Sequence, residues 1–143
     1  MFIGQYNHNI DAKGRIIVPA RFREELGDKV IICKWLDGCL AIYTQDQWEK
    51  LLEQLVTLPS TMREARIYQR TMLANALEAE FDSQGRVLLA QPLIKEAGIV
   101  KECVFIGVGD HVECWAKESW DAFNKTNESA FEEVAEKLTE YLR

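Results

Sequence analysis

Two short segments of this chain place an aspartate and an arginine four residues apart, with a glycine just before the arginine. Residues 11–18 read Asp-Ala-Lys-Gly-Arg-Ile-Ile-Val, and residues 82–89 read Asp-Ser-Gln-Gly-Arg-Val-Leu-Leu. Aspartate at the first position and glycine at the fourth predict a type I turn with the glycine in the left-handed region. The carboxylate can accept hydrogen bonds from the turn backbone and pair with the arginine. Taken alone, each segment predicts a tight turn closed by an ion pair.

The first segment also carries positive charge that the second lacks. Lys13 lies at its tip, Arg15 follows the turn, and Arg21 and Arg23 flank the next predicted helix. A two-stranded ribbon can enter the DNA major groove, where arginine bonds guanine and lysine neutralises phosphate. The second copy keeps an arginine, Arg86, at the position of Arg15. At the positions that correspond to Lys13, Arg21 and Arg23 it has the uncharged residues Gln84, Pro92 and Ile94. We therefore expect the first copy to contact an anion and the second to be mainly structural.

The net charge is not that expected of a generally basic nucleic-acid-binding protein. The chain has 143 residues and a formal net charge of −6. Residues 1–71 carry a net +1, whereas residues 72–143 carry −7. The positive charge that could face an anion is thus concentrated in the first half.

The repeated segments belong to an internal duplication. The turn residues Asp11, Gly14 and Arg15 recur 71 positions later as Asp82, Gly85 and Arg86. Gly27 recurs at the same offset as Gly98. At an offset of 72, Tyr43 and Trp48 correspond to Trp115 and Trp120. Each copy is too small to bury a good core alone, so we expect the two copies to pack on each other.

Local patterns predict the same elements in each copy. In the first, strands are expected at 3–10, 15–18, 30–35 and 40–43, with a short helix at 20–26 and a helix capped by Thr44. A capping-box pattern at Thr61 predicts a helix running to about residue 79, and another at Ser129 predicts a C-terminal helix. The expected divisions are a first half at 1–58, a linking helix at 59–76, a second half at 77–126 and a C-terminal helix at 127–143.

The two outer helices carry patterned faces. Arg63, Arg66 and Arg70 share one face of the linking helix, which could bind phosphate, contact carboxylates of a neighbouring subunit or remain solvated. The acidic second copy favours subunit contacts over DNA. Phe131, Val134 and Leu138 lie on one stripe of the last helix, which suits core or subunit packing.

Other function classes find little support in the sequence. No apolar run approaches the ~18 residues of a membrane helix, and the N-terminus lacks the pattern of a signal peptide. We therefore expect a cytoplasmic protein. No nucleophile elbow, phosphate-binding glycine loop or His-x-x-x-His pair is present, and the four cysteines lack zinc-site spacing. We expect no enzyme activity, no metal, no cofactor and no small-molecule substrate.

The chain resembles a known family. The opening Met-Phe-Ile-Gly-Gln-Tyr and residues 11–23, with both Asp-x-x-x-Arg motifs and the helix between the copies, are similar to MraZ. This family is the duplicated member of the SpoVT-AbrB group of swapped-hairpin proteins. The resemblance implies an α+β fold of two tandem β-α-β-β halves whose hairpins swap within one chain to form a pseudo-two-fold barrel.

The resemblance also implies a function. It implies a bacterial transcriptional regulator, typically a repressor of the division and cell-wall gene cluster, that binds direct repeats in double-stranded DNA upstream of its own gene. It implies a homo-oligomeric ring associated with the nucleoid, with Asp11, Lys13 and Arg15 as the binding motif and Asp82 and Arg86 as the second motif. Related folds also occur as antitoxins, in which a tail binds a toxin, and this alternative remains. One departure, Ala90 in place of the expected proline with Pro92 two residues later, predicts a shifted second short helix.

Overall fold

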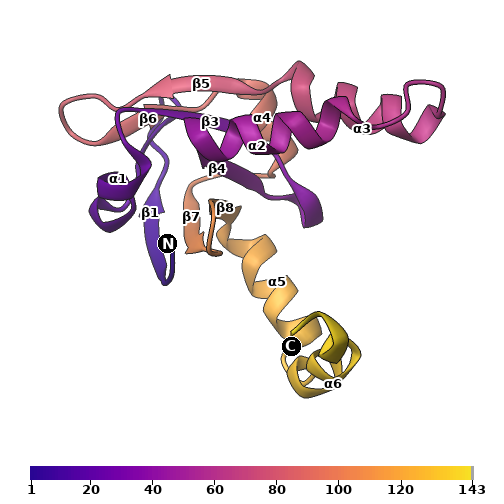
Figure 1. Cartoon of the computed structure of the whole chain (residues 1–143). Helices are drawn as coiled ribbons and strands as arrows, with labels where there is room; N and C mark the ends of the chain where they lie inside the picture. The colour runs from indigo at the N-terminus through magenta and orange to yellow at the C-terminus, as the bar shows by residue number, and fades with distance from the viewer. Residues whose placement is uncertain (143) are drawn as a thin grey trace.

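The duplication is visible in the order of the elements. The computed structural model describes residues 1–142 as a mixed α+β fold (Figure 1). The first half contains β1 (Gln5–Asn9), β2 (Arg15–Ile17), α1 (Ala20–Leu26), β3 (Lys29–Lys34), a 3₁₀ turn (Leu36–Gly38), β4 (Leu40–Thr44), α2 (Gln45–Val56) and α3 (Arg63–Ala74). The second contains β5 (Leu77–Glu80), β6 (Arg86–Leu88), α4 (Gln91–Glu96), β7 (Glu102–Gly107), β8 (Val112–Ala116), α5 (Lys117–Asn127), α6 (Phe131–Lys137) and a final 3₁₀ turn (Thr139–Tyr141).

The two halves exchange strands. The first strand of each half pairs with the third strand of the other, so β1 pairs with β7 and β5 pairs with β3, all antiparallel. The resulting six-stranded sheet has the order β1-β7-β8-β4-β3-β5, and β2 pairs with β6 in a separate two-stranded ribbon. Within residues 1–142 no pairing joins β1 to β5, so closure into a barrel remains a prediction.

One hydrophobic core is built from both halves. Ile16 of β2 and Val87 of β6 face each other across the ribbon, and each is 1% exposed. They belong to a buried cluster to which the short helices contribute Phe22 from α1 and Leu93 from α4. Because the two copies share this cluster, neither half has a separate version of it. A second, smaller cluster lies where α2 and α3 pack near β3 and β4, and its buried members are Cys33, Ala41, Tyr43, Leu55 and Met72.

α1 and the start of α2 follow their local signals, whereas α4 does not show the shift predicted for it. α1 has the predicted bounds, and the backbone N–H of Gln47 donates to Thr44 Oγ1 at 3.1 Å, which confirms the Thr44 cap of α2. The predicted shift of the second short helix is wrong. α4 begins at Gln91, 71 positions after Ala20, and Pro92 is accommodated in its first turn. Proline fits there because the first helical N–H groups have no intrahelical partner.

The linking helix is shorter than its pattern predicts. α3 begins at Arg63 with Met62 as its N-cap, and no side chain caps it, so the expected Thr61 cap is wrong. It ends at Ala74, because Leu77 already pairs with Ile32 at the start of β5. Pairing with β3 thus prevails over the helical propensity of residues 75–79.

The C-terminal segment extends away from the sheet. Figure 1 shows α5 leading out from β8 and α6 lying at its far end. The stripe residues Phe131, Val134 and Leu138 are 82%, 48% and 42% exposed. Of the two expected roles, core packing within this chain is therefore excluded, and subunit packing stays a prediction. None of the helices in residues 1–142 is both long and apolar enough to cross a membrane.

The N-terminal segment lies directly against Gly107. A methyl group added there would overlap the backbone of Phe2 and Ile3, while the Gly107 N–H donates to the Gly4 carbonyl at 2.9 Å. We expect Gly107→Ala to lower the free energy of unfolding by about 1–3 kcal/mol, since backbone cannot move aside as a side chain can. Urea denaturation measures this change. The control is Val108→Ala at the exposed neighbouring residue, which should alter the unfolding free energy by less than about 0.5 kcal/mol. Equal losses of unfolding free energy in the two variants would contradict a steric role for Gly107.

Candidate nucleic-acid interface

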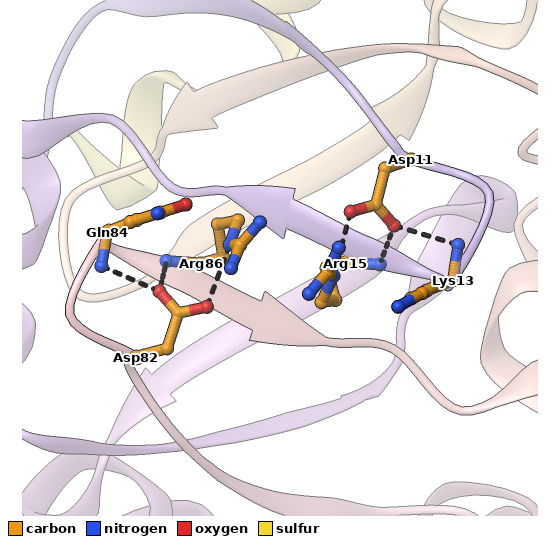
Figure 2. A network of polar contacts seen from close by, with 6 residues as sticks. All are labelled: Asp11, Lys13, Arg15, Asp82, Gln84 and Arg86. Atoms are coloured by element: carbon orange, nitrogen blue, oxygen red, sulfur yellow. Dashed lines mark hydrogen bonds and ion pairs between the residues drawn. The ribbon is translucent and has the colours of Figure 1, made fainter.

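The first turn is organised by one carboxylate. Asp11 Oδ1 accepts from the backbone N–H groups of Lys13 and Arg15, both at 2.9 Å, while Oδ2 accepts from Arg15 Nε at 2.8 Å. The Asp11 carbonyl accepts from Gly14 N–H at 3.1 Å. These bonds form the predicted turn and ion pair, and they place Lys13 at its tip (Figure 2).

The second turn repeats this geometry. Asp82 Oδ1 accepts from the backbone N–H groups of Gln84 and Arg86 at 2.9 Å, and Oδ2 accepts from Arg86 Nε at 2.7 Å. Figure 2 shows the two turns at opposite ends of the β2–β6 ribbon. The two motifs, separated by 71 residues in sequence, therefore form one structural unit.

Each turn is tied to the strand of the other half through its glycine. Gly14 and Gly85 have φ values of 82° and 77°, a conformation that side chains disfavour. The Gly14 carbonyl accepts from Leu89 N–H at 2.8 Å, and the Gly85 carbonyl accepts from Val18 N–H at 3.1 Å. The glycine conformation thus lets each turn both reverse the chain and extend the ribbon pairing.

The ribbon presents both arginines on its outward face. Arg15 pairs with Leu88 and Ile17 pairs with Arg86, so these four side chains share one face, because side chains alternate along a strand. Ile17 is 39% and Leu88 is 58% exposed. The outward face therefore carries two guanidinium groups at diagonal positions, each opposite an exposed aliphatic side chain.

The aspartates fix the arginines without using their terminal nitrogens. Each arginine donates from Nε to its aspartate, and within residues 1–142 no hydrogen bond engages the Nη atoms of either. The Arg15 and Arg86 side chains remain 34% and 24% exposed. A guanidinium held in this way can still present a pair of N–H donors to a guanine edge or a phosphate.

Hydrogen bonding keeps both aspartates ionised. The backbone N–H of Arg86 is the main cause that lowers the pKa of Asp82 to about 2, with further contributions from the Arg86 side chain and the Gln84 N–H. The same set of donors, with Arg15 first, lowers the pKa of Asp11. Both ion pairs thus persist at neutral pH.

The other basic residues named from the sequence lie in different places. Arg21 is exposed on α1, whereas Arg23 is partly buried and lies over Gly85 of the second turn. Arg63 and Arg70 are exposed on α3, and Arg66 donates from Nη1 to the Ser60 carbonyl at 2.9 Å. Figure 1 shows α3, which carries these three arginines, away from β6 of the ribbon.

No group of three or more His, Cys, Asp or Glu side chains among residues 1–142 is arranged to hold a metal ion. All four cysteines are buried and free. His111 is also buried, where it stacks on Tyr43 with ring centroids 4.9 Å apart and lies 2.7 Å from Asp110 Oδ1.

Comparison with known proteins identifies the family. The profile of the family described as "MraZ protein, putative antitoxin-like" matches residues 1–71 and again residues 72–141. The chain belongs to the MraZ family. The two matches divide the chain at the duplication, so family membership covers both turns.

Similar family members span nearly the whole chain. A protein of Caldanaerobacter subterraneus subsp. tengcongensis is 48% identical over 141 residues, covering 99% of each chain. One of Desulforamulus reducens is 47% identical over 142 residues, covering 99% of this chain and 100% of its own. One of Lactobacillus helveticus is 42% identical over 138 residues, covering 96% of each. All three are named "Transcriptional regulator MraZ".

Sequence reasoning missed two features of this surface. The first is the exposed pair of Ile17 and Leu88. It could have been predicted from the alternation of side chains along Arg15-Ile16-Ile17, because burial of Ile16 places Arg15 and Ile17 on the opposite, outward face. The position of Arg23 against the second turn has no local signal, since it depends on how the halves exchange strands.

The Asp82 carboxylate gives the fold a defined acid sensitivity. Its folded pKa is about 2 and its ordinary value 3.8, so between these values the unfolded chain binds a proton that the folded chain does not. Stability therefore falls as pH drops through this window. We expect Asp82→Asn to be less stable than the wild type at pH 7 and to lose less stability on acidification. Urea midpoints from pH 7 to 2 test this.

The control for this prediction is Asp28→Asn, which changes an exposed loop carboxylate. It should keep the acid sensitivity of the wild type. Identical pH slopes for the wild type and Asp82→Asn would show that the Asp82 hydrogen bonds do not couple to folding.

Proposed function

We propose that this protein is a sequence-specific DNA-binding transcriptional regulator. The observation that carries the proposal is the outward face of the β2–β6 ribbon, on which Asp11 and Asp82 hold Arg15 and Arg86 with their terminal nitrogens free to bond. A two-stranded ribbon has dimensions that suit the major groove. The relatives are named transcriptional regulators, which supports the proposal. The DNA-contacting residues are proposed to be Lys13, Arg15, Arg21, Arg23 and Arg86.

The target and the sign of regulation rest on the family resemblance. We propose repression of the bacterial division and cell-wall gene cluster through direct repeats upstream of the protein's own gene. The protein would act in the cytoplasm in association with the nucleoid. The exchange of β1 and β5 between halves supports the further proposal that each half is a swapped-hairpin, AbrB-like unit.

A homo-oligomer would overcome the small charge of one ribbon. One ribbon offers few cations, and each neutralised phosphate adds only a limited, salt-dependent contribution to affinity. Several ribbons in one ring make later contacts effectively intramolecular and multiply the effect. We therefore propose that a ring presents several ribbons to the repeated DNA sites.

Two surfaces of this chain fit contacts between subunits. Arg63, Arg66 and Arg70 surround Ile67, which is 45% exposed, on the outer face of α3. At the far end of the chain, α6 combines an exposed apolar stripe with acidic side chains that include Glu132, Glu133 and Glu136. Opposite charge beside exposed apolar area on both surfaces supports docking of the C-terminal segment of one copy on α3 of the next.

Arg15 should be needed for DNA binding. We expect Arg15→Ala to weaken binding to DNA from upstream of the protein's own gene by on the order of 10- to 100-fold, because a bidentate arginine contact contributes about 1–3 kcal/mol. Fluorescence anisotropy across a salt series measures the change, with scrambled DNA for comparison. Lys125→Ala removes one positive charge from α5 and should bind as the wild type does. Equal binding by Arg15→Ala and wild type would refute the ribbon as the DNA-contacting surface.

The α3 arginines should be needed for assembly. We expect the triple variant Arg63→Glu, Arg66→Glu and Arg70→Glu to lose the oligomer, because like charges would then face the acidic segment of the next copy. Light scattering measures the mass. A matched variant reverses three exposed lysines elsewhere, Lys50, Lys95 and Lys101, and should remain assembled. An unchanged mass for the α3 variant would reject this interface.

A further inference from the structure

The second turn receives a positive charge from the other half of the chain. Arg23 of α1 lies so close over Gly85 that a side chain at Gly85 would collide with its guanidinium. Arg23 also donates from Nη1 to the Val18 carbonyl, which follows β2. The missing side chain at Gly85 therefore leaves the space that this guanidinium occupies.

The first turn has an apolar side chain at the equivalent place. Ile94 of α4 lies 71 positions after Arg23, and its Cδ1 is 3.5 Å from where a Cβ on Gly14 would be. Each short helix thus covers the turn of the opposite half. Because of this exchange, the arginine counted with the first copy in sequence belongs to the second turn in space.

This placement gives the two ends of the ribbon the same number of cations among the turn residues and their helix contacts. The first end carries Lys13 and Arg15 against Asp11, with Ile94 as its helix contact. The second end carries Arg23 and Arg86 against Asp82, with Gln84 at its tip. Each end therefore has two cations and one carboxylate among these residues, although only one turn has a basic tip.

We infer that the second turn is a second DNA-contact site, in which Arg23 contacts a backbone phosphate as Lys13 does at the first. This inference rests on the proposed function and deepens it, because it assigns Arg23 to the second turn and names a backbone phosphate as its contact. It differs from the expectation, based on sequence alone, that the second copy is mainly structural.

The local geometry suits a phosphate contact. The bond to Val18 and the contact with Gly85 limit the freedom of the Arg23 guanidinium, so less entropy is lost when it binds an anion. Glu24, Asp28 and Asp82 line the same cavity as Arg23 and Gln84. Their charges disfavour an anion deep in that cavity, so the phosphate is assigned to its open side, beside Gln84 at the tip of the second turn.

Salt dependence tests the inference. We expect Arg23→Gln to reduce the slope of log K against log salt by about 1 for each engaged chain, the same change as Lys13→Gln. The probe is the duplex from upstream of the protein's own gene. Adding Gln84→Lys to Arg23→Gln should restore the slope, because it gives the second turn the basic tip of the first. Lys50→Gln on α2 should leave the slope unchanged.

The outcomes separate the inference from the proposed function. A reduced slope for Lys13→Gln with a wild-type slope for Arg23→Gln would overturn the inference and leave the function standing. A reduced slope for Arg23→Gln that Gln84→Lys does not restore would assign Arg23 a structural role and also overturn it. Absence of salt-dependent DNA binding by the wild type would overturn both.

A second measurement does not depend on how Arg23 variants fold. Ala12 and Ser83 are equivalent exposed tip positions, and the four native cysteines are buried. Ala12→Cys and Ser83→Cys can each carry the same photo-crosslinker. We expect both to crosslink to the duplex; crosslinking from Ala12→Cys alone would overturn the inference.

Discussion

The rest of the structure depends on the closure of each turn by the opposite half of the chain. The Gly14 carbonyl bonds to Leu89 N–H at 2.8 Å, and the Gly85 carbonyl bonds to Val18 N–H at 3.1 Å. These bonds flank the β2–β6 pairing, under which Ile16 and Val87 are almost completely buried. The surface that faces outward and the core beneath it are therefore opposite faces of one short ribbon. A change that loosens a turn must weaken both, since three-residue strands have little pairing to spare.

The carboxylate beside each arginine orients that arginine and does not simply cancel its charge. Asp11 and Asp82 each use one oxygen for two backbone N–H groups and the other for an arginine Nε. The guanidinium is then fixed at its inner edge while its outer nitrogens remain free. A lysine could not divide its donors in this way, because its single ammonium group would itself be held by the carboxylate. The side-chain entropy that binding would otherwise cost is partly lost already on folding.

Local chemistry allowed the turns and the first short helix to be predicted, but not the partners of these elements. Asp-x-x-Gly specifies its own turn, and the bounds of α1 follow from residues near it in sequence. The pairing of β1 with β7 and of β5 with β3 depends on contacts between distant residues. The same limitation explains the end of α3, where a helical pattern gives way to β5, and the exposed stripe at Phe131. Amphipathic patterns indicate which side chains need a partner, but not whether that partner lies in the same chain.

Strand and helix exchange also changes how the charge of this chain must be counted. Divided by sequence, the halves carry +1 and −7, which suggests one basic and one acidic unit. When the charges are grouped by position on the ribbon instead, Arg23 belongs to the second turn, and each end of the ribbon carries two cations. Of the fourteen acidic residues in 72–143, Asp82 lies in the second turn, and the others are spread over β5, α4, β7, β8, the C-terminal helices and the connecting segments. An acidic body with a basic ribbon favours approach of a polyanion ribbon-first, because the body repels it in other orientations.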